Sequence, residues 1–153
     1  MPTIEIVCLN QTKPTDFSDF SFAVWSEDEI ASHRGLFHSD FSDLQGCIYH
    51  LGNPDLKEEK DGLFCAYELI NEAISDDDET DDFLKFNDEF VPQIKEMFNQ
   101  LINNSPIGKL IFSSDWQFGT KDVKRFKAIA NNEFWEYHDL GKLRFNALYK
   151  IER

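Results

Sequence analysis

Few glycines, three cysteines and no long apolar stretch mark this sequence, and each shortage excludes a class of protein. Only 7 of its 153 residues are glycine. It has neither a Gly-x-Gly-x-x-Gly motif nor a phosphate-binding loop, which argues against the common nucleotide-binding folds. No stretch approaches the roughly 18 apolar residues that a membrane span requires, and the N-terminus lacks the basic and apolar regions of a secretory signal. We therefore expect a cytoplasmic protein without a membrane partner.

The cysteines follow no pattern that indicates disulfides. Cys8, Cys47 and Cys65 are odd in number and include no Cys-x-x-Cys pair. Each of them lies among apolar residues, which is typical of buried free thiols in a reducing compartment. The sequence therefore predicts three structural thiols.

Motifs for nucleophilic catalysis and metal binding are also missing. No Gly-x-Ser-x-Gly elbow occurs. A zinc site needs three or four ligands in a shared geometry. His33 and His38 are close to Asp40 in the sequence, but the spacing across Gly35 does not place both histidines on one helical face. Neither a metal nor a cofactor is predicted.

Negative charge is what the sequence has in excess, and it is unevenly placed. The chain has 29 Asp and Glu against 15 Lys and Arg, a net charge of −14. Residues 1–100 hold 23 acidic and 6 basic residues, whereas residues 101–153 hold 6 and 9. Because such a charge repels phosphate backbones, nucleic acid is not an expected partner, although residues 121–127 are locally basic. The imbalance either keeps the protein soluble or forms an acidic face that steers a basic partner.

The pattern of apolar residues predicts one globular domain over residues 1–153. The chain is 41% hydrophobic and includes 15 Phe, enough for a core. β-branched runs and alternation predict five strands. Spacings of three and four predict helices, the longest of them with Pro92 in its first turn. The strands are expected at 3–9, 20–25, 45–51, 109–114 and 143–151, and the helices at 27–34, 63–74, 89–103, about 120–130 and 133–138.

Strands that alternate with helices in this way predict an α/β or α+β fold, with a single sheet packed against helices. Asn131 and Asn132 are expected to break the helix at 120–130 before the next begins. The pattern does not give the order of the strands.

The most unusual segment is an acidic run at residues 76–82. A calcium loop beginning at Asp78 would have Phe83 at the position of the central glycine, so calcium is not predicted. The run is either a solvated loop that supports the next helix through its dipole or a docking surface for a basic partner. The candidate partner-binding residues in it are Asp76, Asp77, Asp78, Glu79, Asp81 and Asp82.

A second candidate surface lies at residues 133–139. Trp135 and Tyr137 stand beside carboxylates there and could bind Lys or Arg of a partner through cation–π contacts. The simpler alternative is that Phe134 and Trp135 pack the last helical turn onto the sheet.

Two classes of function fit these features. The first is a non-enzymatic protein-binding module, in one version an immunity or inhibitor protein that covers a basic toxin such as a nuclease. The second is a small enzyme or ligand-binding protein with a site near Asp115 and His138, because active-site loops of α/β proteins often follow a strand. A subunit of a larger assembly, with aromatic residues at an interface, is a third. The acidity and the lack of catalytic motifs favour the first.

Overall fold

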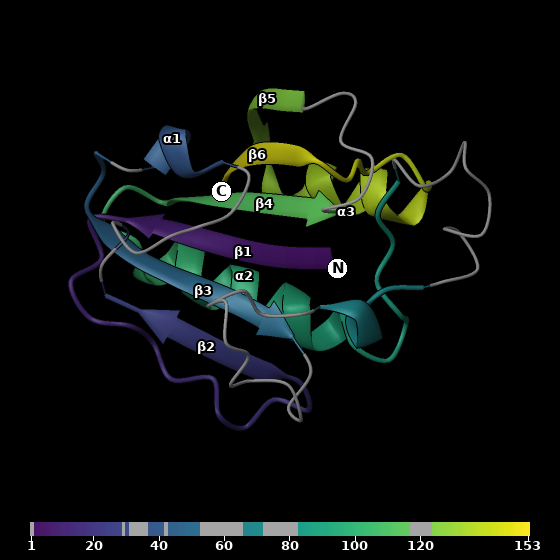
Figure 1. The fold of residues 1–153 in the computed structure, drawn as a ribbon, viewed down its shortest axis with the longest axis horizontal. Helices are drawn as coiled ribbons and strands as arrows, with labels where there is room; N and C mark the ends of the chain where they lie inside the picture. The colour runs from purple at the N-terminus through teal and green to yellow at the C-terminus, as the bar shows by residue number, and fades with distance from the viewer. Residues whose placement is uncertain are drawn as a thin grey trace.

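The structure, a computed structural model, describes residues 2–28, 30, 37–41, 43–52, 66–71, 83–116 and 124–153. Its centre is a six-stranded mixed sheet with the strand order β2-β3-β1-β4-β6-β5 (Figure 1). The strands are β1 (Pro2–Leu9), β2 (Ala23–Glu27), β3 (Gly46–Gly52), β4 (Lys109–Trp116), β5 (Lys124–Ala130) and β6 (Ala147–Glu152). The helices are α1 (His38–Phe41), the short 3-10 helix η3 (Tyr67–Leu69), α2 (Val91–Asn104) and α3 (Asn131–Asp139).

The fold is of the α+β class, with more strands than helices. All strand pairs are antiparallel except β5 with β6, which run parallel. Because β1 and β6 both flank β4, the two ends of the chain lie in one sheet.

One face of the sheet, here the helix face, packs against α2 and α3, which lie behind the strands in Figure 1. Alternation along β1 puts Ile4, Ile6 and Cys8 on this face. Aromatic rings fill the space beneath the helices. Phe98 lies 5.8 Å from Phe112 and 5.3 Å from Phe134, measured between ring centroids. Full burial of each such ring contributes about 1.5–3 kcal/mol to stability.

The other face of the sheet, here the open face, carries the alternate residues of the same strands. At one end they form a second apolar cluster with α1 and the residue before it, Phe37. At the other end the residues are polar but still buried. The buried apolar members of the second cluster are Val7, Ile30, Phe37, Phe41, Ile48, Ile111 and Leu148.

Most of the predicted strands are confirmed, with shifts at their ends. The strands at 3–9, 45–51 and 109–114 correspond to β1, β3 and β4, while β2 begins three residues later than predicted and β6 begins at Ala147. The helix at 89–103 is α2, with Pro92 in its first turn as predicted. The predicted helix at 27–34 lies mostly outside the described residues, and Glu27 belongs to β2.

The helix predicted at 63–74 is wrong over residues 66–71, the part that the structure describes. After η3, Ile70 is extended, with φ −102° and ψ 141°, and forms an antiparallel bridge with Phe86. Both side chains are buried in the core. Pairing with a distant segment therefore replaced the local helical preference, because it buries both side chains while the flanking Asn71 and Asn87 N–H groups form hydrogen bonds across the bridge.

The helix predicted at 120–130 is also wrong, because residues 124–130 form β5. Phe126 and Ile129 are three residues apart, which suits a helix and would place them on opposite faces of a regular strand. A bulge between them changes this, so that Phe126 pairs with Tyr149 and Ile129 with Ile151 on the same face. The helix α3 then begins at Asn131, so Asn131 and Asn132 open a helix instead of breaking one.

Gly46, at the start of β3, gives a test of how closely β3 and its neighbour β1 approach each other. Its φ is +151°, and a Cβ there would collide with the backbone carbonyl oxygen of Cys8. We expect Gly46→Ala to lower the free energy of unfolding by about 3 kcal/mol, through backbone strain and the clash. Urea unfolding measures this. Gly141→Ala is the matched control, because Gly141 has φ +69° and no atom within 4 Å of the added Cβ. Gly141→Ala should lower the free energy of unfolding by about 1–2 kcal/mol. Equal losses of stability in the two variants would contradict the proposed clash at Gly46.

Candidate functional site

The acidic run lies outside the described residues, but the segments on either side of it are described and lie together. Ile70 and Phe86 form their antiparallel bridge there. The Asn71 N–H donates to the Lys85 carbonyl and the Asn87 N–H donates to the Leu69 carbonyl, each at 2.8 Å. The two points where the chain enters and leaves residues 72–82 are therefore held side by side.

A hollow of about 460 Å³ lies beside this bridge, and we name it the acidic hollow. Its walls come from η3 and from the residues before α2. The Asn87 side-chain amide donates to the Glu68 carbonyl at 2.8 Å and joins the two walls. The residues that matter for its chemistry are Tyr67, Glu68, Asn87, Glu89 and Phe90.

The acidic hollow suits a basic side chain. Tyr67 is 43% exposed, and Glu68 and Glu89 are also exposed. An aromatic ring attracts a cation at its face, and carboxylates accept hydrogen bonds from Lys or Arg. None of the described residues that line this hollow is basic. A Lys or Arg side chain could place its methylene groups on the aromatic rings and its charge near the carboxylates.

Trp135 and Tyr137, predicted together as a partner surface, lie in different environments. Trp135 is only 6% exposed and packs 5.2 Å from Phe98. Its ring already has a cation above it, because the Lys95 ammonium lies 5.3 Å from the ring centroid. Tyr137 is 40% exposed. The burial of Trp135 agrees with packing onto the sheet, and only Tyr137 is available to a ligand.

His138 of α3 connects this helix to the segment that contains Phe86. It is buried, and its Nε2 accepts a hydrogen bond from the Phe86 N–H at 3.0 Å. Its Nδ1 lies 3.0 Å from Asp139 Oδ1, so the proton of the neutral ring belongs on Nδ1. Burial lowers the pKa of His138, while the hydrogen bond to Asp139 opposes this effect. The ring therefore acts as a neutral acceptor in the folded protein.

Asp115, the other residue of the predicted enzyme site, is far from this arrangement. Alternation along β4 puts it on the open face with Ser113, and it pairs with Thr3 of β1. His138 packs on the helix face, against Phe86. The sheet thus separates Asp115 from His138, and the structure does not bring these two residues into one site.

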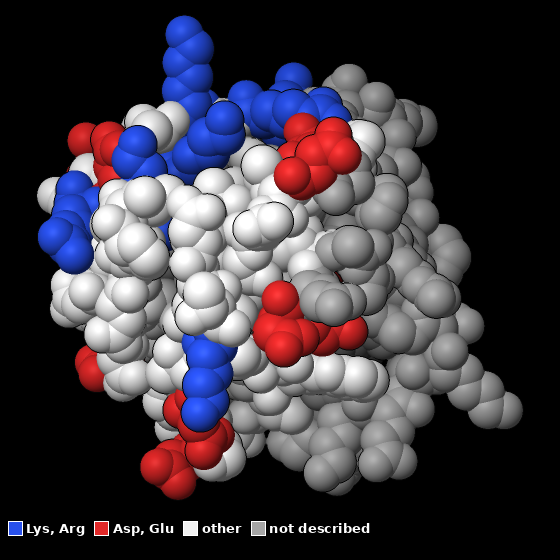
Figure 2. Space-filling view, turned by 90° about the vertical axis from the view of Figure 1, so that its left-hand side faces the viewer, with Lys and Arg blue, Asp and Glu red and all other residues white. Residues whose placement is uncertain are grey.

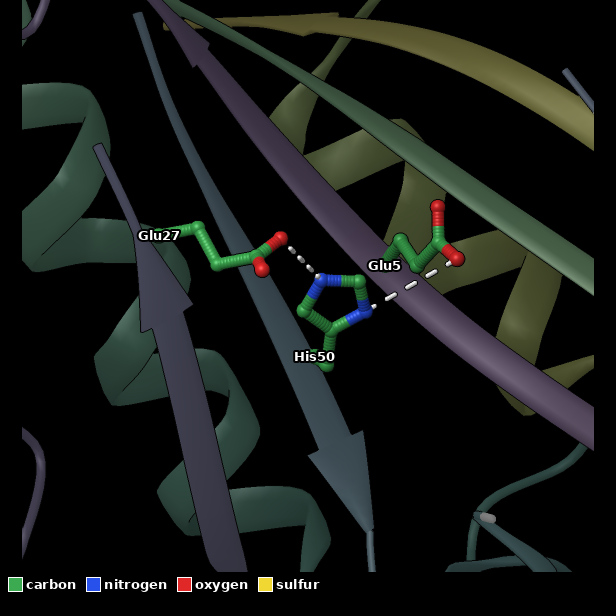
Figure 3. A network of polar contacts seen from close by, with 3 residues as sticks. All are labelled: Glu5, Glu27 and His50. Atoms are coloured by element: carbon green, nitrogen blue, oxygen red, sulfur yellow. Dashed lines mark hydrogen bonds and ion pairs between the residues drawn. The ribbon is translucent and has the colours of Figure 1, made fainter. Parts of the chain in front are cut away.

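A buried polar cluster on the open face was not predicted from the sequence. His50 of β3 lies between two carboxylates, with Nε2 3.3 Å from Glu27 Oε2 and Nδ1 3.8 Å from Glu5 Oε1 (Figure 3). His50 and Glu5 are 5% and 3% exposed. Each ring nitrogen of His50 thus faces a carboxylate oxygen, and the three side chains join β1, β2 and β3. A polar Glu5 within an apolar strand was the sequence signal, but its partners depend on strand pairing.

The structure gives no metal site over the residues it describes. No group of three or more His, Cys, Asp or Glu among them is arranged to hold an ion. Asp40, which is close to His33 and His38 in the sequence, is bound by the Arg125 guanidinium at 2.9 and 3.2 Å. His33 lies outside the described residues.

Cys8 and Cys47 face each other across β1 and β3, and both are buried free thiols. Burial raises the pKa of Cys8 to about 12, with a smaller contribution from Cys47. Burial also raises the pKa of Cys47, as does nearby Asp28. Since the thiolate is the nucleophile, neither thiol is activated for catalysis. The third cysteine, Cys65, lies outside the described residues.

No family model, curated protein or solved structure matches this chain. Its function must therefore be inferred from the arrangement of its own residues. Within the described part of the chain, no helix has the length and apolarity needed to cross a membrane.

The role of His138 predicts how stability depends on pH. Its pKa in the folded protein is lowered, so the unfolded chain binds the proton more readily. The stabilisation is therefore complete above the ordinary histidine pKa of about 6.5 and is lost as the pH falls through the folded value. His138→Gln keeps an acceptor for the Phe86 N–H but cannot titrate in this range.

We expect His138→Gln to cost about 1 kcal/mol at pH 8 and to be less sensitive than the wild type to a fall from pH 7 to pH 5. Urea unfolding at each pH measures both. Parallel pH profiles for the two proteins would show that His138 does not contribute to the dependence.

The buried thiols predict slow chemistry. With a pKa of about 12, Cys8 is ionised in only about one molecule in 10⁴ at pH 8. In a Cys65→Ser variant, the folded protein should react with an aromatic disulfide reagent only slowly, and both remaining thiols should react at once in denaturant. Rapid modification of Cys8 or Cys47 in the folded variant would show that one of them is accessible and activated.

Proposed function

We propose that this chain is a non-enzymatic protein-binding module that engages a basic partner protein through the acidic hollow and the acidic run beside it. The observation that carries the proposal is the position of the hollow. It lies at the Ile70–Phe86 bridge, where the chain enters and leaves the segment containing residues 76–82. Glu68 and Glu89 supply the carboxylates of the described part, and we expect the run to add its negative charge to theirs, since residues 71 and 83 precede and follow the segment that contains it in the sequence.

The acidic hollow is built on rigid structure, which favours binding. Ile70 and Phe86 are buried in the main core, and Asn87 fixes the wall that carries Glu68. A site whose side chains are already positioned loses less conformational entropy when a partner binds. Tyr67 supplies an exposed aromatic surface of the kind that concentrates binding energy in interfaces.

Electrostatics would act at a longer range than these contacts. We expect the six acidic residues among 76–82 to add to the negative charge of Glu68 and Glu89. Such a region attracts a basic protein before contact and raises the rate of association more than it slows dissociation. An immunity or inhibitor protein that covers a basic toxin is one form of this function, supported by the small size and the acidity of the chain.

The alternative, a small enzyme with its site near Asp115 and His138, has less support. The sheet separates these two residues, and His138 is engaged by Phe86 and Asp139. The buried thiols Cys8 and Cys47 do not offer an activated nucleophile either.

Partner capture tests the proposal. The immobilised full chain is exposed to extract of its native cell, and proteins released by salt are identified and produced for surface plasmon resonance. We expect a basic protein among them. Glu68→Gln/Glu89→Gln should lower its association rate about two- to tenfold at low salt, and neutralising residues 76–82 should lower it further. These differences should shrink as salt is added, because screening weakens the same charges.

The matched control is Asp43→Asn/Glu133→Gln, which removes two exposed carboxylates elsewhere on the surface. It should change the association rate less than Glu68→Gln/Glu89→Gln does. All variants should keep their stability within about 0.5 kcal/mol, since the substitutions are at the surface. If the two double variants lower the association rate equally, the net charge of the protein matters and the position of the acidic hollow does not. An unchanged association rate for every variant would contradict the proposal.

A further inference from the structure

A second hollow has the opposite chemistry and is not part of the proposed protein interface. It measures about 600 Å³ and is lined by residues of β5, β6, α3 and the segment 142–144, together with Phe83. We name it the basic hollow. Four of its lining residues are cationic and four are aromatic, and none of those that the structure describes is acidic. The cations are Lys124, Lys127, Lys142 and Arg144.

The walls of the basic hollow are well ordered by contacts between rings and cations. Phe126 stacks on buried Tyr149, with ring centroids 4.4 Å apart and planes 5° from parallel. The Tyr149 hydroxyl accepts a hydrogen bond from the Arg144 N–H at 2.8 Å. The Arg144 guanidinium lies 4.8 Å from the centroid of the Phe83 ring. These contacts hold Arg144 and Phe126 in place.

Other groups in the hollow are accessible. Tyr137 is 40% exposed, and the ammonium-bearing residues Lys124, Lys127 and Lys142 are exposed. In Figure 2, Lys and Arg lie along the upper edge of the molecule, the edge at which Figure 1 places β5, with Asp and Glu beside them, although the chain as a whole has a net charge of −14. A local surplus of cations in an acidic protein calls for an anionic ligand.

We propose that the basic hollow binds a nucleoside phosphate. A planar base would stack on the exposed Tyr137 ring, with the half-buried Phe126 ring as the other aromatic wall, since base–aromatic stacking tolerates many sequences and geometries. The phosphates would bind Arg144 and the lysines, because a guanidinium matches phosphate oxygens and an ammonium acts as a point charge. The volume lies in the range of small-molecule sites.

This ligand is compatible with the two features of the sequence that argue against nucleotides. A glycine-rich loop, which this sequence lacks, binds phosphate through backbone N–H groups. The basic hollow offers side-chain cations for the same purpose. The negative net charge repels a nucleic acid, which extends over much of the surface. Its effect on a single nucleotide is weaker, because charges more than about 8 Å away are largely screened at physiological salt.

Isothermal titration calorimetry of the full chain with three probes tests the inference. ATP carries both a base and phosphates, adenosine carries only the base, and tripolyphosphate carries only the phosphates. We expect ATP to bind with a dissociation constant below about 1 mM, and each of the other two to bind about tenfold more weakly or worse. Adenosine or tripolyphosphate binding as tightly as ATP would overturn the proposal, as would no binding of ATP.

Two exposed side chains allow the hollow to be tested without risk to the fold. Tyr137→Ala should weaken the binding of ATP about fivefold or more, because one stacking contact is lost. It should leave the binding of tripolyphosphate unchanged. Lys142→Ala should weaken both ATP and tripolyphosphate about fivefold. Lys13→Ala removes an exposed cation that does not line the hollow, and it should change neither.

Two further outcomes would contradict the assignment. If Lys13→Ala weakens the binding of ATP as much as Lys142→Ala does, ATP is attracted to surface cations in general and not to the basic hollow. If a hexaglutamate peptide binds more tightly than ATP and competes with it, the hollow is a docking site for an acidic peptide. Neither result bears on the acidic hollow, whose partner carries the opposite charge.

Discussion

The contact between Phe86 and His138 fixes the segment on which both hollows depend. The Phe86 N–H donates to the buried imidazole, and its ring stacks 5.5 Å from the same histidine. Phe86 also forms an antiparallel bridge with Ile70. Phe83 lines the basic hollow and Asn87 the acidic one. The contact with the buried His138 therefore holds in place a segment that contributes one or more residues to each hollow.

The two hollows carry charges of opposite sign, and we propose that they bind different ligands. The acidic hollow joins a ring to carboxylates, which suits a basic side chain, whereas the basic hollow joins rings to cations, which suits a phosphate. Aromatic residues supply the contact area in both, and the sign of the neighbouring charge decides the ligand. The net charge of −14 describes neither surface.

The errors in the secondary-structure predictions have a common physical cause. Spacings of three and four indicated helices at 63–74 and 120–130, but where these segments are described they pair with distant parts of the chain. Ile70 gains a bridge to Phe86, and the bulge in β5 lets Phe126 and Ile129 reach one face of the sheet. In both cases a tertiary contact buried the same apolar side chains that a helix would have presented. Periodicity identified Ile70, Phe126 and Ile129 as residues that pack against the core, the last two only partly buried, but it gave the wrong backbone conformation for them.

The sequence by itself determined the strands β1, β3 and β4, the helix α2, the burial of Cys8 and Cys47, and the uneven distribution of charge. These properties depend on residues close together in the chain, through alternation, helical spacing and composition. Only the tertiary structure decided that Glu5 and Glu27 flank His50, that the sheet separates Asp115 from His138, and that lysines of β5 meet Tyr137. Those contacts depend on the order and register of the strands, which are fixed by packing between segments far apart in sequence.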